Sequence, residues 1–323
     1  MIYFAPMEGI TDAFYRKTHH RIFGNIDKYF IPFISPTQDR CLPPREMRAI
    51  GPEVNAGLPV VPQILTRDPE LFVWLANRLS EMGYTEVNLN LGCPSGTVTA
   101  KGKGSGMLQD PDALRVFLDY VYGHTQVPVS IKTRIGYVSV EEWETLFKLL
   151  DDYPIYELIV HPRTRQEFYR GDVHLDIYGK IAESVHCPVV YNGNLFRMPD
   201  INALMNSHVQ TNAIMLGRGL LSNPALAREA KGGQPLMKQE ITVFHDALYR
   251  AYADCYPESI VLGKMREITK YLASSFMEPK KILKMVFKAR NADAYLSAVA
   301  MLMQHDLCAF PGYDPVKPSQ TWP

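Results

Sequence analysis

"VNLNLGCPSG", residues 87–96, joins a short apolar run to a cysteine, a proline and a glycine-rich loop. The run has the length of one β-strand, and Asn90 and Cys93 stand where the strand gives way to the loop. A buried, unreactive thiol is the ordinary explanation of such a cysteine. A reactive group at the mouth of an active site is the alternative, and the rest of the chain decides between the two.

Apolar runs of this kind recur along the first two thirds of the chain, and amphipathic segments separate several of them. The runs are residues 2–7, 28–35, 60–65, 86–92, 128–136, 156–163, 188–194 and 212–221. Segments 69–83 and 111–123 have helical apolar spacing, and Asp110 is a candidate cap for the second. Alternating strands and helices predict parallel strands, because only a crossover returns the chain to start a parallel neighbour. The fold class is therefore α/β, and residues 1–235 favour a closed (β/α)8 TIM barrel over a doubly wound open sheet.

Polar side chains lie near the carboxyl end of nearly every run. They are Glu8, Gln63, Asn90, Cys93, Lys132, Arg134, His161, Arg163, Asn192, Asn194 and Arg218. A barrel brings these ends to one rim, where barrel enzymes hold their active sites, whereas an open sheet spreads them along a line. Taken singly, Lys132 can extend its ammonium from a strand end and His161 can be a hydrogen-bonded core residue. Their coincidence favours a single active site at a barrel rim.

The last two runs end in glycine-containing sequences that are typical of a phosphate site. "YNGN" (191–194) ends the seventh run, and "LGRGLL" (216–221) ends the eighth. Glycines let backbone amides approach a ligand closely, and the following segment can present a helix N-terminus. Gly-Arg-Gly alone occurs in many turns. The two sequences together predict binding of a phosphorylated cofactor such as FMN.

Composition limits the classes of function. Of the 323 residues 46% are hydrophobic, and 34 basic side chains balance 34 acidic ones. One or two globular domains are expected, and any nucleic-acid binding has to come from a local basic patch. The five cysteines are far apart and form no CxxC or Cys/His cluster, which predicts a reduced compartment and no metal site. Because signal-peptide features and an apolar run of ~20 residues are absent, we expect a cytoplasmic protein outside the membrane.

The chain changes character after "KGGQP" (231–235), where the pattern becomes helical. Residues 261–291 hold eight Lys or Arg against two Glu, a local net charge of +6. Lys281, Lys284 and Lys288 fall on one helix face. A solvated basic face is the ordinary explanation. Beside a barrel with a predicted site for a phosphorylated cofactor, binding of a ligand's phosphate groups is the favoured explanation.

Seven motifs occur in order along the predicted barrel. They are APMEGITD (5–12), PQI (62–64), LNLGCPS (89–95), IKTRIG (131–136), VHPRT (160–164), NGN (192–194) and GRG (217–219). The set resembles the tRNA-dihydrouridine synthases. The resemblance implies an FMN-binding TIM-barrel catalytic domain over 1–235, a helical tRNA-binding domain over 236–310 and a tail over 311–323. It also implies reduction of the C5–C6 double bond of specific uridines in tRNA with FMN and NADPH, and we expect a monomer.

The same resemblance implies roles for individual residues. Cys93 matches the catalytic cysteine. The implied cofactor-binding residues are Pro6, Met7, Glu8, Gln63, Asn90, Lys132, His161, Asn192, Gly193, Asn194, Gly217 and Arg218. The expected tRNA contacts are Lys101, Arg134, Arg163, Lys281, Lys284 and Lys288, and Lys103 stays an alternative to Lys101 in the loop 97–108. Glu8 and Asn194 differ from the residues common at these positions in the family, which leaves the subgroup and the target uridine open.

The chemistry agrees with these residues. When hydride adds to C6 of uracil, C5 must receive a proton, and a thiol with an ordinary pKa of roughly 8.5 is mostly protonated at neutral pH. We therefore expect Cys93 to be the general acid. Two alternatives stay open. One is an FMN-dependent reductase of a free pyrimidine, similar to dihydroorotate or dihydropyrimidine dehydrogenases, and the other is a non-catalytic, flavin-containing tRNA-binding protein.

Overall fold

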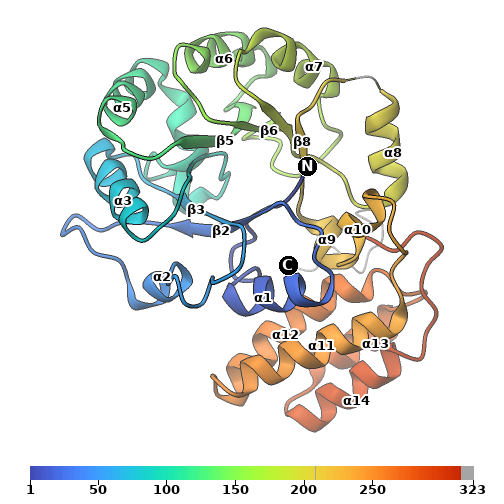
Figure 1. Ribbon diagram of the computed structural model, residues 1–323. Coiled ribbons are helices and arrows are strands. Elements are labelled where there is room, and N and C mark those ends of the chain that lie inside the picture. The colour runs from blue at the N-terminus through green and yellow to red at the C-terminus, as the bar shows by residue number, and fades with distance from the viewer. Residues whose placement is uncertain (208, 314–323) are drawn as a thin grey trace. The chain divides into compact units, whose positions relative to one another are not determined.

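Eight parallel strands close a barrel in the order β1 to β8 in the computed structural model, which describes residues 1–207 and 209–313 (Figure 1). The strands are β1 (Ile2–Phe4), β2 (Lys28–Ile34), β3 (Val60–Ile64), β4 (Val87–Leu91), β5 (Val129–Gly136), β6 (Leu158–Thr164), β7 (Val189–Tyr191) and β8 (Ala213–Leu216). Each lies within one of the eight apolar runs, except that β6 extends one residue beyond its run, to Thr164. The predicted (β/α)8 barrel is confirmed, and the open sheet is excluded.

Helices and short turns connect the strands. They are α1 (Ala13–Ile22), α2 (Pro44–Ala49), α3 (Pro69–Glu81), α4 (Gly96–Thr99), the 3-10 turn η1 (Gly104–Gln109), α5 (Pro111–His124), η2 (Val140–Glu142), α6 (Trp143–Asp151), α7 (Leu175–Ser184), α8 (Met198–Asn206), α9 (Arg218–Ser222) and α10 (Leu226–Ala230). The predicted cap is confirmed, because the Asp110 carboxylate accepts from the backbone N–H of Ala113 at 3.0 Å. Asp68 caps α3 in the same way, by accepting from Leu71 at 3.0 Å. In both helices the residue after the cap is proline, which suits the first helical position.

One apolar run divides between a strand and a helix. The run 212–221 forms β8 and then α9, with Gly217 between them. Gly217 has φ −116° and ψ −99°, a backbone conformation outside the strand and helix regions. The strand therefore ends five residues before the apolar run does.

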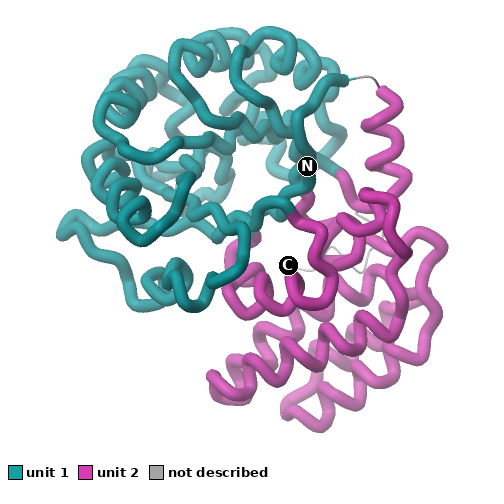
Figure 2. Tube along the Cα trace, viewed as in Figure 1, with its two compact units in different colours: residues 1–6, 27–194, 209–215 teal, residues 7–26, 195–208, 216–323 magenta. Residues whose placement is uncertain are grey.

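The chain forms two compact units (Figure 2). The first comprises residues 1–6, 27–194 and 209–215, and the second comprises the described parts of 7–26, 195–208 and 216–323. The helices expected over 236–310 are present in the second unit as α11 (Lys238–Ala253), α12 (Glu258–Ala273), α13 (Lys280–Lys288) and α14 (Ala292–Leu302). The boundary at residue 235 stays a prediction. Of the predicted tail 311–323, residues 314–323 lie outside the described residues.

Apolar side chains fill the interior of the barrel. They are Tyr3, Ala5, Phe30, Val61, Ile159, Val190, Ala213 and Met215. An ionic cluster lies where the strands begin: the ammonium of Lys28 contacts carboxylate oxygens of Glu86 at 2.7 Å and Glu157 at 3.0 Å. Glu157 also accepts from the hydroxyl of Tyr3 at 2.6 Å. The charged side chains at the amino-terminal ends of these strands are therefore paired with one another.

The second unit is a helical assembly with its own core. α11 packs against α1 and α12, and α13 packs against α14. The predicted apolar stripe of α12 is buried at Val261, Met265, Ile268 and Leu272. In the described part of the chain, no helix has the length and apolar character that crossing a membrane requires.

Candidate active site

Two side-chain amides meet near the carboxyl ends of β3 and β4. Asn90 Nδ2 donates to Gln63 Oε1 at 2.7 Å, and both side chains are buried. Asn90 Oδ1 accepts from the backbone N–H groups of Gly92 at 3.1 Å and Cys93 at 2.9 Å. The amide pair is therefore bonded directly to the segment that carries Cys93.

Cys93 is half-buried at the start of the loop that leads from β4 to α5. Its carbonyl oxygen accepts from the hydroxyl of Ser105 at 2.8 Å and from the backbone N–H of Ser105 at 3.2 Å. Gly104 has φ +58°, and a Cβ there would lie 3.0 Å from the Cβ of Cys93. Glycine suits this position for both reasons. The loop folds back onto Cys93 and fixes its backbone.

Lys132 lies on β5 and is paired with Asn90 in the barrel register. Burial and the charge of Arg134 lower the pKa of its ammonium to about 7, although Cys93 acts in the opposite direction. Among the described residues, the ammonium has no hydrogen bond or ion pair. A half-buried cation that the strand register pairs with Asn90 fits a ligand with carbonyl oxygens and an anionic form, as a flavin ring has.

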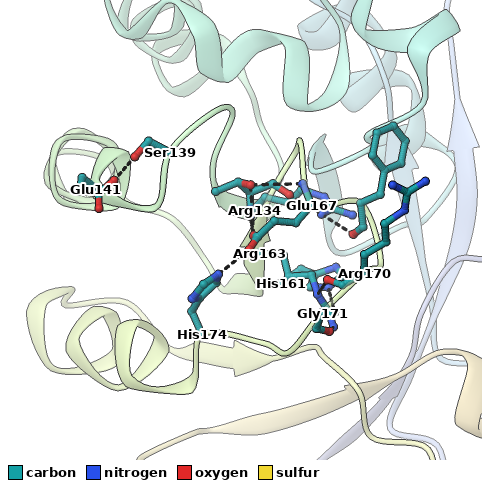
Figure 3. A network of polar contacts seen from close by, with 11 residues as sticks. Arg134, Ser139, Glu141, His161, Arg163, Glu167, Arg170, Gly171 and His174 are labelled. Atoms are coloured by element: carbon teal, nitrogen blue, oxygen red, sulfur yellow. Dashed lines mark hydrogen bonds and ion pairs between the residues drawn. The ribbon is translucent and has the colours of Figure 1, made fainter. Parts of the chain in front are cut away.

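Arg134 and Arg163 are buried and donate to backbone carbonyls of the loop after β6 (Figure 3). Arg134 donates to the carbonyls of Gly92 at 2.9 Å, Thr164 at 2.8 Å and Phe168 at 2.8 Å. Its guanidinium also lies 5.4 Å from the ring centre of Tyr169. These contacts connect the Cys93 loop to the loop that follows β6, and a contact of Arg134 with tRNA stays a prediction.

Arg163 holds the second half of that loop. Its guanidinium donates to the carbonyl of Arg170 at 3.1 Å and to that of Gly171 (Figure 3). It also contacts His161 Nε2 at 3.1 Å and Asn194 Oδ1 at 3.2 Å. The structure thus brings His161 and Asn194 together through Arg163. A direct contact of Arg163 with tRNA stays a prediction.

The remaining expected cofactor residues of the first unit lie at the ends of β1 and β7. Asn192 Nδ2 donates to the carbonyl of Met215 at 2.8 Å, which connects the end of β7 to β8. Gly193 follows, and a Cβ there would lie 2.9 Å from a methyl group of Val173. Pro6 is half-buried after β1. Close packing therefore favours glycine at position 193.

Four expected cofactor residues belong to the second unit. Met7 and Glu8 form a turn in which Met7 accepts, through its carbonyl, from the backbone N–H groups of Ile10 and Thr11 at 3.0 Å. Gly217 precedes α9, and Arg218 begins it. The guanidinium of Arg218 lies 4.9 Å from the ring centres of both Phe196 and Tyr313. Two aromatic rings therefore support this guanidinium.

The basic residues proposed for tRNA differ in exposure. Lys281, Lys284 and Lys288 are exposed on α13, and the intervening Ile282, Leu283 and Val286 are buried. The predicted basic face of this helix is therefore present.

In the loop after Cys93, Lys101 is exposed and Lys103 is half-buried. Burial, with the charges of Lys101 and Arg67, lowers the pKa of Lys103. Lys103 and Arg67 line a cleft of about 550 Å³. Both lysines stay candidates for an RNA contact.

Sequence reasoning missed several residues that connect to the site. They are Glu86, Asn88, Ser105, Ser130 and Tyr169. The first two had a signal, since Glu86, Asn88 and Asn90 alternate along one strand and alternation places them on one face. Tyr169 had none, because only the fold brings it within 5.9 Å of the ring of His161.

Solved structures share the barrel. The chain superimposes on morphinone reductase with a TM-score of 0.51 at 12% identity, covering 73% of this chain and 87% of that one. An old yellow enzyme homologue from Zymomonas mobilis gives a TM-score of 0.51 at 12% identity, covering 75% and 91%. At this identity the likeness concerns the fold alone, which is a (β/α)8 barrel.

Sequence comparison gives the family. The family model described as dihydrouridine synthase (Dus) matches residues 3–303. The tRNA-dihydrouridine(16) synthase of Shigella flexneri is 31% identical over 245 residues, 72% of this chain and 76% of that protein. The protein of that name from Escherichia coli O157:H7 is 28% identical over 311 residues, 91% and 96%. The chain belongs to the dihydrouridine synthase family, and it is a flavin-dependent oxidoreductase.

Proposed function

We propose that the protein reduces the C5–C6 double bond of a uridine in tRNA to 5,6-dihydrouridine, with FMN as bound cofactor and NADPH as reductant. The observation that carries the proposal is the gathering of Cys93, Lys132 and the Gln63–Asn90 amide pair at the carboxyl ends of neighbouring barrel strands. Membership of the dihydrouridine synthase family supports it. When bound, the flavin supplies the hydride that adds to C6 of the uracil.

Cys93 supplies the proton. Its thiol gives a proton to C5 as hydride reaches C6, so both hydrogens of the product are accounted for, and the thiolate then takes a proton from solvent. The hydrogen bonds to Asn90 and Ser105 hold the backbone of this residue on both sides. Such support keeps the distance from thiol to substrate constant during the reaction.

Lys132 contributes charge. An ammonium whose pKa burial has lowered to about 7 gains stability when an anionic group binds beside it. In the proposed site, Gln63 and Lys132 contact the flavin ring, and Pro6, Met7 and Glu8 lie against it. Asn90 and His161 line the same cofactor pocket. Asn192, Gly193, Asn194, Gly217 and Arg218 hold the flavin's ribityl chain and phosphate.

The substrate base has to leave its stack in the RNA before it reaches this pocket. The rest of the tRNA then requires its own contacts, and the exposed lysines of α13 provide positive charge for phosphates. Because relatives from several bacteria carry the name tRNA-dihydrouridine(16) synthase, we assign the reaction to the uridine at position 16. The enzyme acts as a monomer in the cytoplasm. Size-exclusion chromatography tests the monomeric state.

The test follows the bound flavin. Under anaerobic conditions the FMN-loaded enzyme is reduced with NADPH, and tRNA from cells that lack this protein is added. Rapid return of the flavin absorbance with this tRNA, and no return with free uracil, is the expected result. If the flavin absorbance returned with free uracil but not with tRNA, the substrate would be a free pyrimidine and the proposed function would be excluded.

A further inference from the structure

An unbroken series of hydrogen bonds crosses the barrel interior from an acidic side chain to the backbone of Cys93. Its five side chains, which we name the amide relay, are in order Glu86, Ser130, Asn88, Gln63 and Asn90. All five are buried, with exposed fractions from 0% to 7%. They come from β3, β5 and the segment that contains β4.

The distances along the amide relay are short throughout. Ser130 Oγ donates to Glu86 Oε1 at 2.6 Å and accepts from Asn88 Nδ2 at 2.9 Å. Asn88 Oδ1 accepts from Gln63 Nε2 at 2.8 Å, and Gln63 Oε1 accepts from Asn90 Nδ2 at 2.7 Å. Each amide therefore uses both its oxygen and its nitrogen within the series.

Both ends of the amide relay impose the same direction on it. At one end, the backbone N–H groups of Gly92 and Cys93 can only donate, so Asn90 has to present its oxygen to them. At the other end, Glu86 accepts from Ser130 and from the ammonium of Lys28 at 2.7 Å. Burial raises the pKa of Glu86 above its usual value, although Lys28 and Ser130 act in the opposite direction.

No single member can reverse its amide. If Asn88 turned over, its nitrogen would face the nitrogen of Gln63, and its oxygen would face a hydroxyl whose proton is already given to Glu86. A buried donor or acceptor left without a partner is costly. The orientation of the Gln63 amide therefore depends on groups that lie deeper in the barrel. One N–H of Gln63 Nε2 is not used within the amide relay, which leaves a donor of fixed direction.

We propose that Glu86, Ser130 and Asn88 are positioning residues for the active site. Their hydrogen bonds fix the Gln63 amide in the orientation that the bound flavin meets, and through Asn90 they hold the backbone of Cys93. This inference rests on the proposed function, since it takes Gln63 as a flavin contact and Cys93 as the proton donor.

Ser130→Ala tests the proposal, because it removes one link and touches neither flavin nor substrate. We expect the FMN dissociation constant, measured by quenching of flavin fluorescence, to rise about tenfold. In the flavin-free protein we expect a changed rate of Cys93 alkylation by iodoacetamide. That rate is read by peptide mass spectrometry against the exposed Cys41 of the same molecules.

Thr133→Val is the matched control. Thr133 is equally buried on the same strand, but its hydroxyl donates to the carbonyl of Arg134 at 2.9 Å, outside the amide relay. Both measured quantities should stay at the wild-type value. Asn88→Leu breaks a second hydrogen bond of the amide relay, and it tests the positioning role if Ser130→Ala does not fold.

The outcomes separate the two proposals. FMN affinity and Cys93 reactivity that are equal in Ser130→Ala, Asn88→Leu and Thr133→Val would overturn the positioning role and leave the proposed function standing. A wild-type protein that binds no FMN would contradict the proposed function itself.

Discussion

The backbone N–H of Cys93 donates to the side-chain oxygen of Asn90 at 2.9 Å, and Asn90 in turn donates to Gln63 at 2.7 Å. The residue proposed to give the proton and the residue proposed to contact the flavin are thus joined through one asparagine. Because buried hydrogen bonds of this kind restrict motion, the two parts of the reaction share a common support.

Cys93→Ala should leave FMN affinity at the wild-type value and lower the rate of dihydrouridine formation about 10²-fold to 10⁴-fold, the usual contribution of a positioned general acid. Single-turnover assays on tRNA from cells without the enzyme measure the rate. The rate for Cys93→Ser, which keeps a weakly acidic proton, should lie between the rates of the wild type and Cys93→Ala. An alanine variant with wild-type turnover would assign the proton to another group.

Lys132→Met should stabilise the flavin-free protein, and the gain should depend on pH. The folded pKa of about 7 is lower than the ordinary value of 10.5, so the unfolded chain binds more protons between these values. The cost of the buried ammonium is therefore complete below pH 7 and disappears as the pH approaches 10.5. Urea unfolding of both proteins at several pH values measures the difference, which should shrink by up to about 1.4 kcal/mol per pH unit. A gain that does not vary with pH would contradict the lowered pKa.

Lys28→Met should lower the free energy of unfolding by about 3 kcal/mol, because it leaves the buried Glu86 and Glu157 without their cation. Urea unfolding at neutral pH measures the loss. Lys28→Met combined with Glu86→Gln and Glu157→Gln should recover part of it, since the uncompensated charges are gone. A loss no larger than that of an exposed lysine, such as Lys148, would show that the cluster contributes little.

Tyr313→Ala should weaken binding of FMN about fivefold and leave binding of riboflavin unchanged. The ring of Tyr313 lies 4.9 Å from the guanidinium of Arg218, a contact that contributes about 1 kcal/mol, and riboflavin lacks the phosphate that Arg218 is proposed to hold. Fluorescence titration measures both affinities. Tyr313→Phe keeps the ring and should behave as the wild type. Equal losses of affinity for FMN and riboflavin would show that Tyr313 does not act through the phosphate.

Replacing Lys281, Lys284 and Lys288 together with glutamine should weaken tRNA binding and reduce its salt dependence. Each phosphate contact that is lost lowers the slope of log K against log salt by about 1. Filter binding over a range of salt concentrations measures the slope. Lys148→Gln with Lys180→Gln, two exposed lysines of the first unit, is the control and should change nothing. An unchanged slope in the α13 variant would exclude this face from the interface.

The sequence was informative where local pattern determines structure. Each of the eight strands corresponds to one predicted run, and only β6 extends past its run, by one residue, because apolar alternation and the turn residues between runs are local signals. The direct bond between Gln63 and Asn90 was not predictable, since it depends on the register of β3 against β4. The same holds for Arg134 and Arg163: their positive charge suggested tRNA, but only the fold brings the carbonyls of Thr164, Phe168 and Arg170 to their guanidinium groups.

The most direct measurement is dihydrouridine formation in tRNA from cells that lack this protein, incubated with the purified enzyme, FMN and NADPH. Nuclease mapping with mass spectrometry locates any uridine that gains two hydrogens. The proposed function predicts this gain at position 16, with no turnover of free uracil in a parallel reaction. Turnover of free uracil without any change in the tRNA would contradict it.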